Sequence, residues 1–133
     1  MLSRKWLIPI LIFFAVFVFS SQGLKSGPEV SVKDMGALIK SEPRPVIIDL
    51  RNAAEYQLGH IAGAVSVPQA DFKVRLDGLK LPKTDAVVLY GAGDAEARAM
   101  TKHLYESGYQ GALSLKGGID AWLAAGQTVV KKP

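Results

Sequence analysis

The chain of 133 residues contains no cysteine. Without a thiol it can form no disulfide, no cysteine-ligated metal site and no cysteine-based covalent intermediate. An excess of one charge is also missing once the N-terminus is set aside. Removing residues 1–23 takes Arg4 and Lys5 from the 16 basic residues, which leaves 14 against 12 acidic residues, or a net charge of +2. This near balance does not favour nucleic acid as a partner, since such binding uses a clustered basic face.

The N-terminus has the composition of an export segment. Arg4 and Lys5 precede residues 6–19, which carry no polar side chain, and small residues follow. This order is typical of a secretory signal peptide. An uncleaved anchor is the alternative: fourteen residues rise only about 21 Å as a helix, but the uncharged stretch 6–24 is long enough to approach the roughly 30 Å hydrocarbon core. We predict a signal peptide or N-terminal membrane anchor over residues 1–23 and an extracytoplasmic domain, in the periplasm or an equivalent compartment.

Strand and helix patterns alternate after a short linker at residues 24–29, so residues 30–133 are expected to form one domain. Strands are predicted at 46–50, 65–67, 86–90 and 112–115, and helices at 32–39, from Asn52 to Gly59, at 72–81, from Ala97 to Gly108 and at 119–125. Such alternation favours an α/β fold with a mostly parallel sheet of about five strands flanked by helices. In these sheets ligands bind beyond the carboxyl ends of the strands. The loops after Leu50, Val67, Tyr90 and Leu115 are therefore the candidate site.

Short motifs in both halves of the chain resemble those of the rhodanese-like domain. In the first half they are Asp49-Leu50-Arg51, Glu55-Tyr56, the run from Gly59 to Ala64, and Pro68; in the second half they are Tyr90 with the loop after it, Gly108-Tyr109, Gly117-Gly118, Ala121-Trp122 and Gly126. The resemblance extends from about Val30 to Val130. It implies an α/β sheet domain that, in active members, transfers sulfane sulfur through a cysteine persulfide.

The resemblance places the missing cysteine directly after the strand that ends at Tyr90, where this chain has Gly91. The loop reads Gly91, Ala92, Gly93, Asp94, Ala95 and Glu96. It retains its expected length, but no Ser, Thr or Lys in it replaces the nucleophile. A persulfide cannot form on a residue without a side chain, so the loop is interpreted as a degenerate active-site loop with no catalytic residue.

The charge of this loop also disfavours an anionic substrate. A carboxylate of Asp94 or Glu96 about 7 Å from a bound anion would cost roughly 2 kcal/mol at an effective dielectric constant near 20. Arg98 and Lys116 could offset part of this cost. Asp94 is predicted to be the N-cap of the following helix, where its carboxylate would accept hydrogen bonds from helix amides.

The other polar residues of the motifs are predicted to support the loops. Asp49, Arg51 and Glu55 are expected to form an ion-pair network, and His60 is expected to hold nearby backbone through a hydrogen bond. Gly117 and Gly118 are expected to supply positive φ angles for a tight turn. No His and carboxylate spacing fits a metal site, so neither a metal nor a cofactor is predicted.

Three functional hypotheses follow from the sequence. The favoured one is a non-catalytic binding module for a protein partner in the cell envelope, with membrane contact only through residues 6–24 if they remain attached. The second is a sulfurtransferase-related enzyme that depends on a partner's thiol. The third is an envelope receptor for a small neutral or cationic ligand near Asp94.

Overall fold

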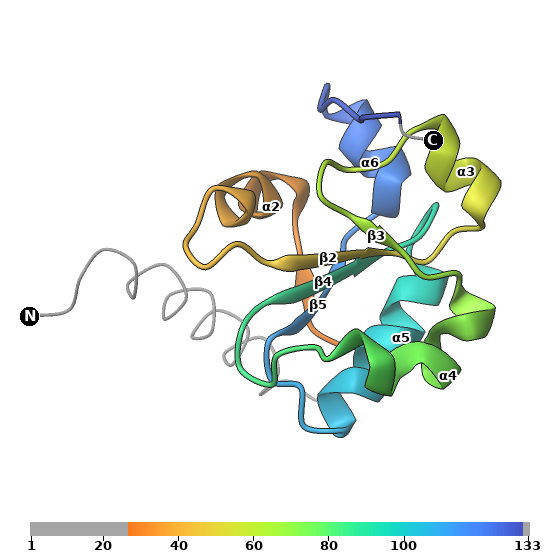
Figure 1. Cartoon of the computed structure of the whole chain (residues 1–133). Helices are drawn as coiled ribbons and strands as arrows, with labels where there is room; N and C mark the ends of the chain where they lie inside the picture. The colour runs from red at the N-terminus through yellow and green to blue at the C-terminus, as the bar shows by residue number, and fades with distance from the viewer. Residues whose placement is uncertain (1–26, 132–133) are drawn as a thin grey trace, which may run out of the picture.

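The computed structural model describes residues 27–131 as an α/β domain built on one parallel sheet (Figure 1). Its elements are β1 (Glu29–Val30), α2 (Val32–Ile39), β2 (Val46–Asp49), α3 (Ala53–Leu58), β3 (Val65–Ser66), α4 (Gln69–Leu79), β4 (Val87–Tyr90), α5 (Ala95–Glu106), β5 (Ala112–Leu115) and α6 (Gly118–Ala124). The five strands lie in the order β1-β5-β4-β2-β3, and every neighbouring pair is parallel. The predicted fold class is confirmed.

Helices cover both faces of the sheet (Figure 1): α2, α3 and α6 lie on one face, α4 and α5 on the other. Each face has its own hydrophobic cluster. Within β2, Ile47 packs into the cluster that contains Trp122 of α6, and the next residue, Ile48, packs into the one that contains Phe72 of α4. Because successive strand residues point to opposite faces and both faces are covered, β2 and β4 read as unbroken apolar runs.

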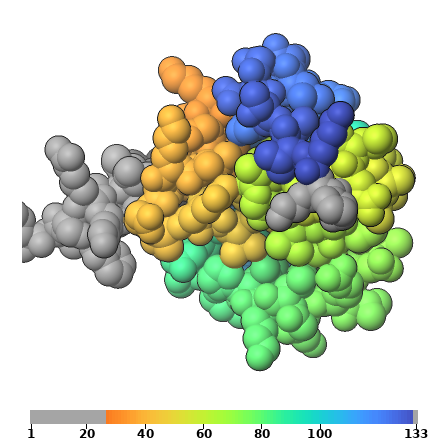
Figure 2. All heavy atoms as spheres, turned by 45° about the horizontal axis from the view of Figure 1, so that its top comes forward, coloured from red at the N-terminus to blue at the C-terminus, as the bar shows by residue number. Residues whose placement is uncertain are grey.

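On the face that carries α6, elements distant in sequence come together. Figure 2 shows the C-terminal segment, in blue, lying between the regions of α2 and α3 on that side of the molecule. The contact near α3 includes an antiparallel bridge, in which the His60 amide donates to the Val130 carbonyl at 2.9 Å and the Val130 amide donates back at 2.8 Å. This bridge ties the end of the described chain to the turn after α3.

Two helices begin directly after residues whose side chains cap them. Ser31 Oγ accepts from the Asp34 amide at 3.1 Å, and Asn52 Oδ1 accepts from the Glu55 amide at 2.9 Å. Both caps have extended backbone, which leaves the side-chain oxygen facing the free amides of the first turn.

The start of the domain lies earlier than predicted. Residues 27–29, expected to end a linker, pack against the domain instead: Gly27 is buried and the Pro28 carbonyl accepts from the Ser114 amide at 2.9 Å. Glu29 then begins β1, which pairs with β5. A strand of two residues is too short to show periodicity, so the sequence did not reveal it.

The predicted export segment, residues 1–23, lies outside the described residues. Among residues 27–131, no helix is long and apolar enough to cross a membrane.

Candidate functional site

The loop after β4 lies where the sequence predicts the site, at the carboxyl edge of the sheet. Gly91 follows Tyr90, the last residue of β4, and is buried. The chain then passes through residues 92–94 to the start of α5 at Ala95. In parallel α/β sheets this edge is where ligands bind, and a strand-to-helix turn there presents backbone amides.

The side-chain space at position 91 is occupied by Glu96. Gly91 is not among the residues with positive φ, so its backbone does not require glycine. A Cβ added to Gly91 would meet Glu96 Oε2, with Glu96 Cδ 3.4 Å and Glu96 Cβ 3.7 Å away. These three atoms of one flexible side chain are the nearest neighbours that the added Cβ would have. The carboxylate therefore sits next to the place where a nucleophilic side chain would project.

The predicted capping role of Asp94 is wrong. Asp94 stands at the N-cap position of α5, but its side chain caps no helix amide. Its backbone is already helical (φ −90°, ψ −36°), whereas the working caps Ser31 and Asn52 are extended. The Asp94 carboxylate turns away from α5 and accepts a hydrogen bond from the Gly117 amide at 2.5 Å. It joins the loop to the turn before α6.

Helix α6 holds the loop through its backbone. The Ile119 amide donates to the Gly91 carbonyl at 3.0 Å, and the Asp120 amide donates to the Ala92 carbonyl at 3.2 Å. The predicted positive φ of the paired glycines is confirmed, at 78° for Gly117 and 62° for Gly118. A Cβ on Gly118 would lie 2.6–2.7 Å from three loop carbonyl oxygens, so glycine is needed there for close approach as well as for conformation.

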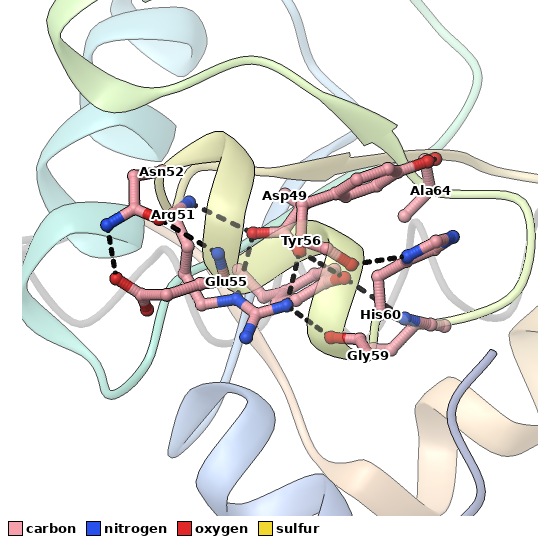
Figure 3. A network of polar contacts seen from close by, with 10 residues as sticks. Asp49, Arg51, Asn52, Glu55, Tyr56, Gly59, His60 and Ala64 are labelled. Carbon is pink, nitrogen blue, oxygen red and sulfur yellow. Dashed lines mark hydrogen bonds and ion pairs between the residues drawn. The ribbon is translucent and has the colours of Figure 1, made fainter. Parts of the chain in front are cut away.

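A buried polar network supports the neighbouring loops (Figure 3). Arg51 contacts both carboxylate oxygens of Asp49, Nε to Oδ1 at 3.1 Å and a terminal nitrogen to Oδ2 at 2.7 Å, and it also donates to the Gly59 carbonyl at 2.6 Å. The Tyr90 hydroxyl donates to Asp49 Oδ2 at 2.8 Å and accepts from the Ile61 amide at 3.1 Å. Sequence reasoning missed the role of Tyr90, because Asp49 lies 41 residues away in the chain.

The protonation of this network follows from its burial. Burial raises the pKa of Tyr90 well above its ordinary value, and the nearby Asp49 carboxylate adds to the rise. For Arg51, burial alone would lower the pKa, but the hydrogen bond and the charge of Asp49 raise it on balance. Tyr90 is thus held neutral and Arg51 charged. These protonation states suit a structural ion pair between Arg51 and Asp49, to which Tyr90 donates a hydrogen bond, rather than proton transfer.

Glu55 does not join the predicted ion-pair network. It belongs to the capping box of α3, where the Asn52 side-chain amide donates to Glu55 Oε1 at 2.7 Å. His60 is buried, with Nδ1 2.8 Å from the Tyr56 carbonyl and its ring stacked on the Tyr56 ring at 3.7 Å between centroids. Tyr56 in turn donates its hydroxyl hydrogen to the Ala64 carbonyl at 2.8 Å. The side chain of His60 thus contacts local backbone.

The two basic residues predicted near the loop are placed differently from each other. Arg98 forms a salt bridge of 3.1 Å with Glu29 of β1. Lys116 is exposed at the end of β5, and its backbone amide donates to the Val30 carbonyl at 2.9 Å. Over the described range 27–131, no group of three or more histidine or acidic residues could hold a metal ion.

The chain is thus an α/β domain with a parallel five-stranded sheet and a strand-to-helix loop at its carboxyl edge. The family profile of the rhodanese-like domain matches residues 31–125. The chain therefore belongs to the rhodanese-like family, as the motifs predicted.

Solved structures and relatives agree with this assignment. The solution structure of a rhodanese-like domain from Anabaena sp. is 32% identical, with a TM-score of 0.68 over 79% of this chain and 80% of that one. The thiosulfate sulfurtransferase of Pseudomonas aeruginosa is 26% identical, with a TM-score of 0.71 over 92% of this chain and 23% of that one. A sulfurtransferase of Allochromatium vinosum is 28% identical over 77% of this chain and 94% of its own length.

Other relatives are larger proteins. The tRNA uridine(34) hydroxylase of Buchnera aphidicola subsp. Baizongia pistaciae is 30% identical over 97 residues, which are 70% of this chain and 31% of the hydroxylase. This chain spans less than a third of the length of such hydroxylases.

Proposed function

We propose that this rhodanese-like protein is a non-catalytic binding module that acts outside the cytoplasm. The proposal rests on the residue found at position 91 and on the side chain that lies beside it. Gly91 offers no atom on which sulfur could be carried, and the Glu96 carboxylate stands beside the place where one would project. No Ser, Thr or Lys occurs between these two residues to serve as a substitute nucleophile.

The loop is nevertheless held in a defined shape, as a binding surface requires. Two α6 amides bind the carbonyls of Gly91 and Ala92, and Asp94 binds the Gly117 amide. None of these contacts uses a side chain at position 91. The shape of this loop therefore does not depend on the side chain at position 91. The loop can present a fixed surface to a protein partner at the carboxyl edge of the sheet.

The place of action is part of the proposal and rests on the sequence. The basic residues Arg4 and Lys5 and the apolar stretch after them support export of the domain to the cell envelope. Mass spectrometry of the N-terminus of the protein recovered from cells tests this directly. A mature chain that begins after about residue 20 supports a cleaved signal peptide, and an intact N-terminus in the membrane fraction supports an anchor. An intact chain in the cytosolic fraction contradicts export.

Sulfur transfer from thiosulfate to cyanide by the purified full chain tests the lack of catalysis. We expect no thiocyanate above the blank, because no persulfide can form on glycine. Turnover by the wild-type protein would overturn the proposal.

Capture of an envelope partner tests the binding role, with Glu96→Arg as the informative variant because Asp94 is engaged in the loop itself. Glu106→Arg, at the far end of the same helix, is the matched control. Equal capture by wild type and Glu96→Arg would count against this loop as the docking surface.

A second candidate is sulfur transfer that uses a partner's thiol. It is favoured by the similarity to the sulfurtransferase of Allochromatium vinosum, because the match covers nearly the whole length of that protein. This function predicts that thiocyanate forms only when an envelope extract is added to the full chain. It also predicts that alkylating the thiols of the extract beforehand abolishes the activity. Activity that survives this alkylation would exclude it.

A further inference from the structure

The Glu96 carboxylate occupies the loop without being bound there. Glu96 is the second residue of α5 and is partly buried. Within residues 27–131 its carboxylate takes part in no hydrogen bond or ion pair, in contrast to Asp94, which binds the Gly117 amide. Its position beside Gly91 is therefore determined by the room available there and by its charge, and not by a specific bond.

Both the space and the charge have identifiable causes. Glycine at position 91 leaves room that any larger residue would fill, and Glu96 Oε2 lies where the Cβ of such a residue would make contact. A carboxylate in the first turn of a helix is also attracted by the positive end of the helix dipole. The two residues are complementary, because the absence of a side chain at one position lets the carboxylate of the other approach the loop.

We propose that the Glu96 carboxylate closes this loop to anionic ligands. The inference rests on the proposed function, since it concerns the same degenerate loop, and it adds which ligands the loop refuses. An anion such as thiosulfate would have to displace the carboxylate and then remain close to its charge. Glu96 thus prevents the anion from binding, before any reaction could take place. Replacing Glu96 alone is expected to let the anion enter the loop.

The test is the binding of thiosulfate to the full chain, measured as the shift in melting temperature at constant ionic strength. The proteins are wild type, Glu96→Ala, Glu96→Gln and the control Glu106→Ala, which removes a carboxylate from the last turn of the same helix. We expect a saturable shift for Glu96→Ala, with an affinity at least about tenfold above that of wild type and Glu106→Ala. Binding by Glu96→Gln as well assigns the exclusion to charge, and binding by Glu96→Ala alone assigns it to bulk.

Two results would overturn the inference. One is wild-type protein that binds thiosulfate as tightly as Glu96→Ala, and the other is a failure of both Glu96 variants to bind. The melting temperature without ligand shows that each variant is folded, and Glu96→Gln preserves the shape of the side chain should Glu96→Ala not fold. The failure of both variants to bind would leave the non-catalytic function standing, because that function is judged by turnover of the wild-type chain.

Discussion

Placing a thiol at position 91 measures how strongly the loop disfavours a negative charge. Gly91→Cys would carry the only cysteine in the chain, so any thiol reagent reports on this site alone. The backbone of Gly91 lies outside the left-handed region and accepts a side chain, provided the tip of Glu96 moves aside. Because a negative charge nearby disfavours the thiolate, we expect Glu96 to raise the pKa of the new cysteine.

The size of this effect follows from the geometry. A sulfur attached to the added Cβ would lie within about 4 Å of the Glu96 carboxylate, where two unit charges at an effective dielectric constant near 20 interact by about 4 kcal/mol. This energy corresponds to about three pKa units. Glu96 is partly exposed and can turn toward water, which weakens the interaction. We therefore expect a rise of about one to two units attributable to Glu96.

The assay is the pH dependence of alkylation by iodoacetamide in Gly91→Cys and in the double variant with Glu96→Gln. The helix N-terminus lowers the pKa of the cysteine in both proteins, so its effect cancels in the difference. Gly91→Cys combined with Glu106→Gln should match Gly91→Cys alone. A difference of less than about 0.3 unit between the first two proteins would refute the assigned role of Glu96.

Two further predictions concern stability, each measured by urea denaturation. Gly118→Ala should lower the free energy of unfolding by about 2 kcal/mol more than Gly126→Ala, because both glycines have positive φ but only Gly118 faces backbone within 4 Å; equal losses would contradict the role of close approach. Tyr90→Phe should cost about 1–3 kcal/mol, since it removes one hydrogen bond to the buried Asp49 carboxylate, which keeps Arg51, and leaves the Ile61 amide without its hydroxyl partner. The raised pKa of Tyr90 means that its contribution is present below about pH 10 and falls as pH rises further, when the unfolded chain ionises first. Tyr90→Phe should lose stability less steeply above pH 10, and parallel profiles would contradict this.

The sheet was predictable from the sequence because its central strands are buried on both faces. The apolar run at residues 46–50 and the one at residues 86–90 correspond to β2 and β4, each within one residue at either end. The edge strand β1 was missed, because its two residues carry no pattern of their own. Its pairing with β5 is set by contacts more than eighty residues apart in the chain.

The position of the candidate loop was predictable, but the orientation of its side chains was not. Spacing from Tyr90 locates Gly91, and the paired glycines locate the turn that faces it. The sequence gives Asp94 and Asn52 similar positions before a helix, yet only Asn52 has the extended backbone that a cap needs. Likewise, nothing in the order of residues shows that Glu96 turns toward Gly91, since this depends on the space that the fold leaves there.

These contacts explain how a degenerate site can keep its architecture. The loop after β4 is held by backbone bonds from Ile119 and Asp120 and by the bond from the Gly117 amide to Asp94, all of which are independent of the side chain at position 91. Glycine at this position therefore leaves in place every one of these bonds that shape the loop, as the proposed non-catalytic function requires. In our proposal the Glu96 carboxylate beside Gly91 changes the charge presented at the carboxyl edge of the sheet, so that the same scaffold selects its ligands differently without a change of fold.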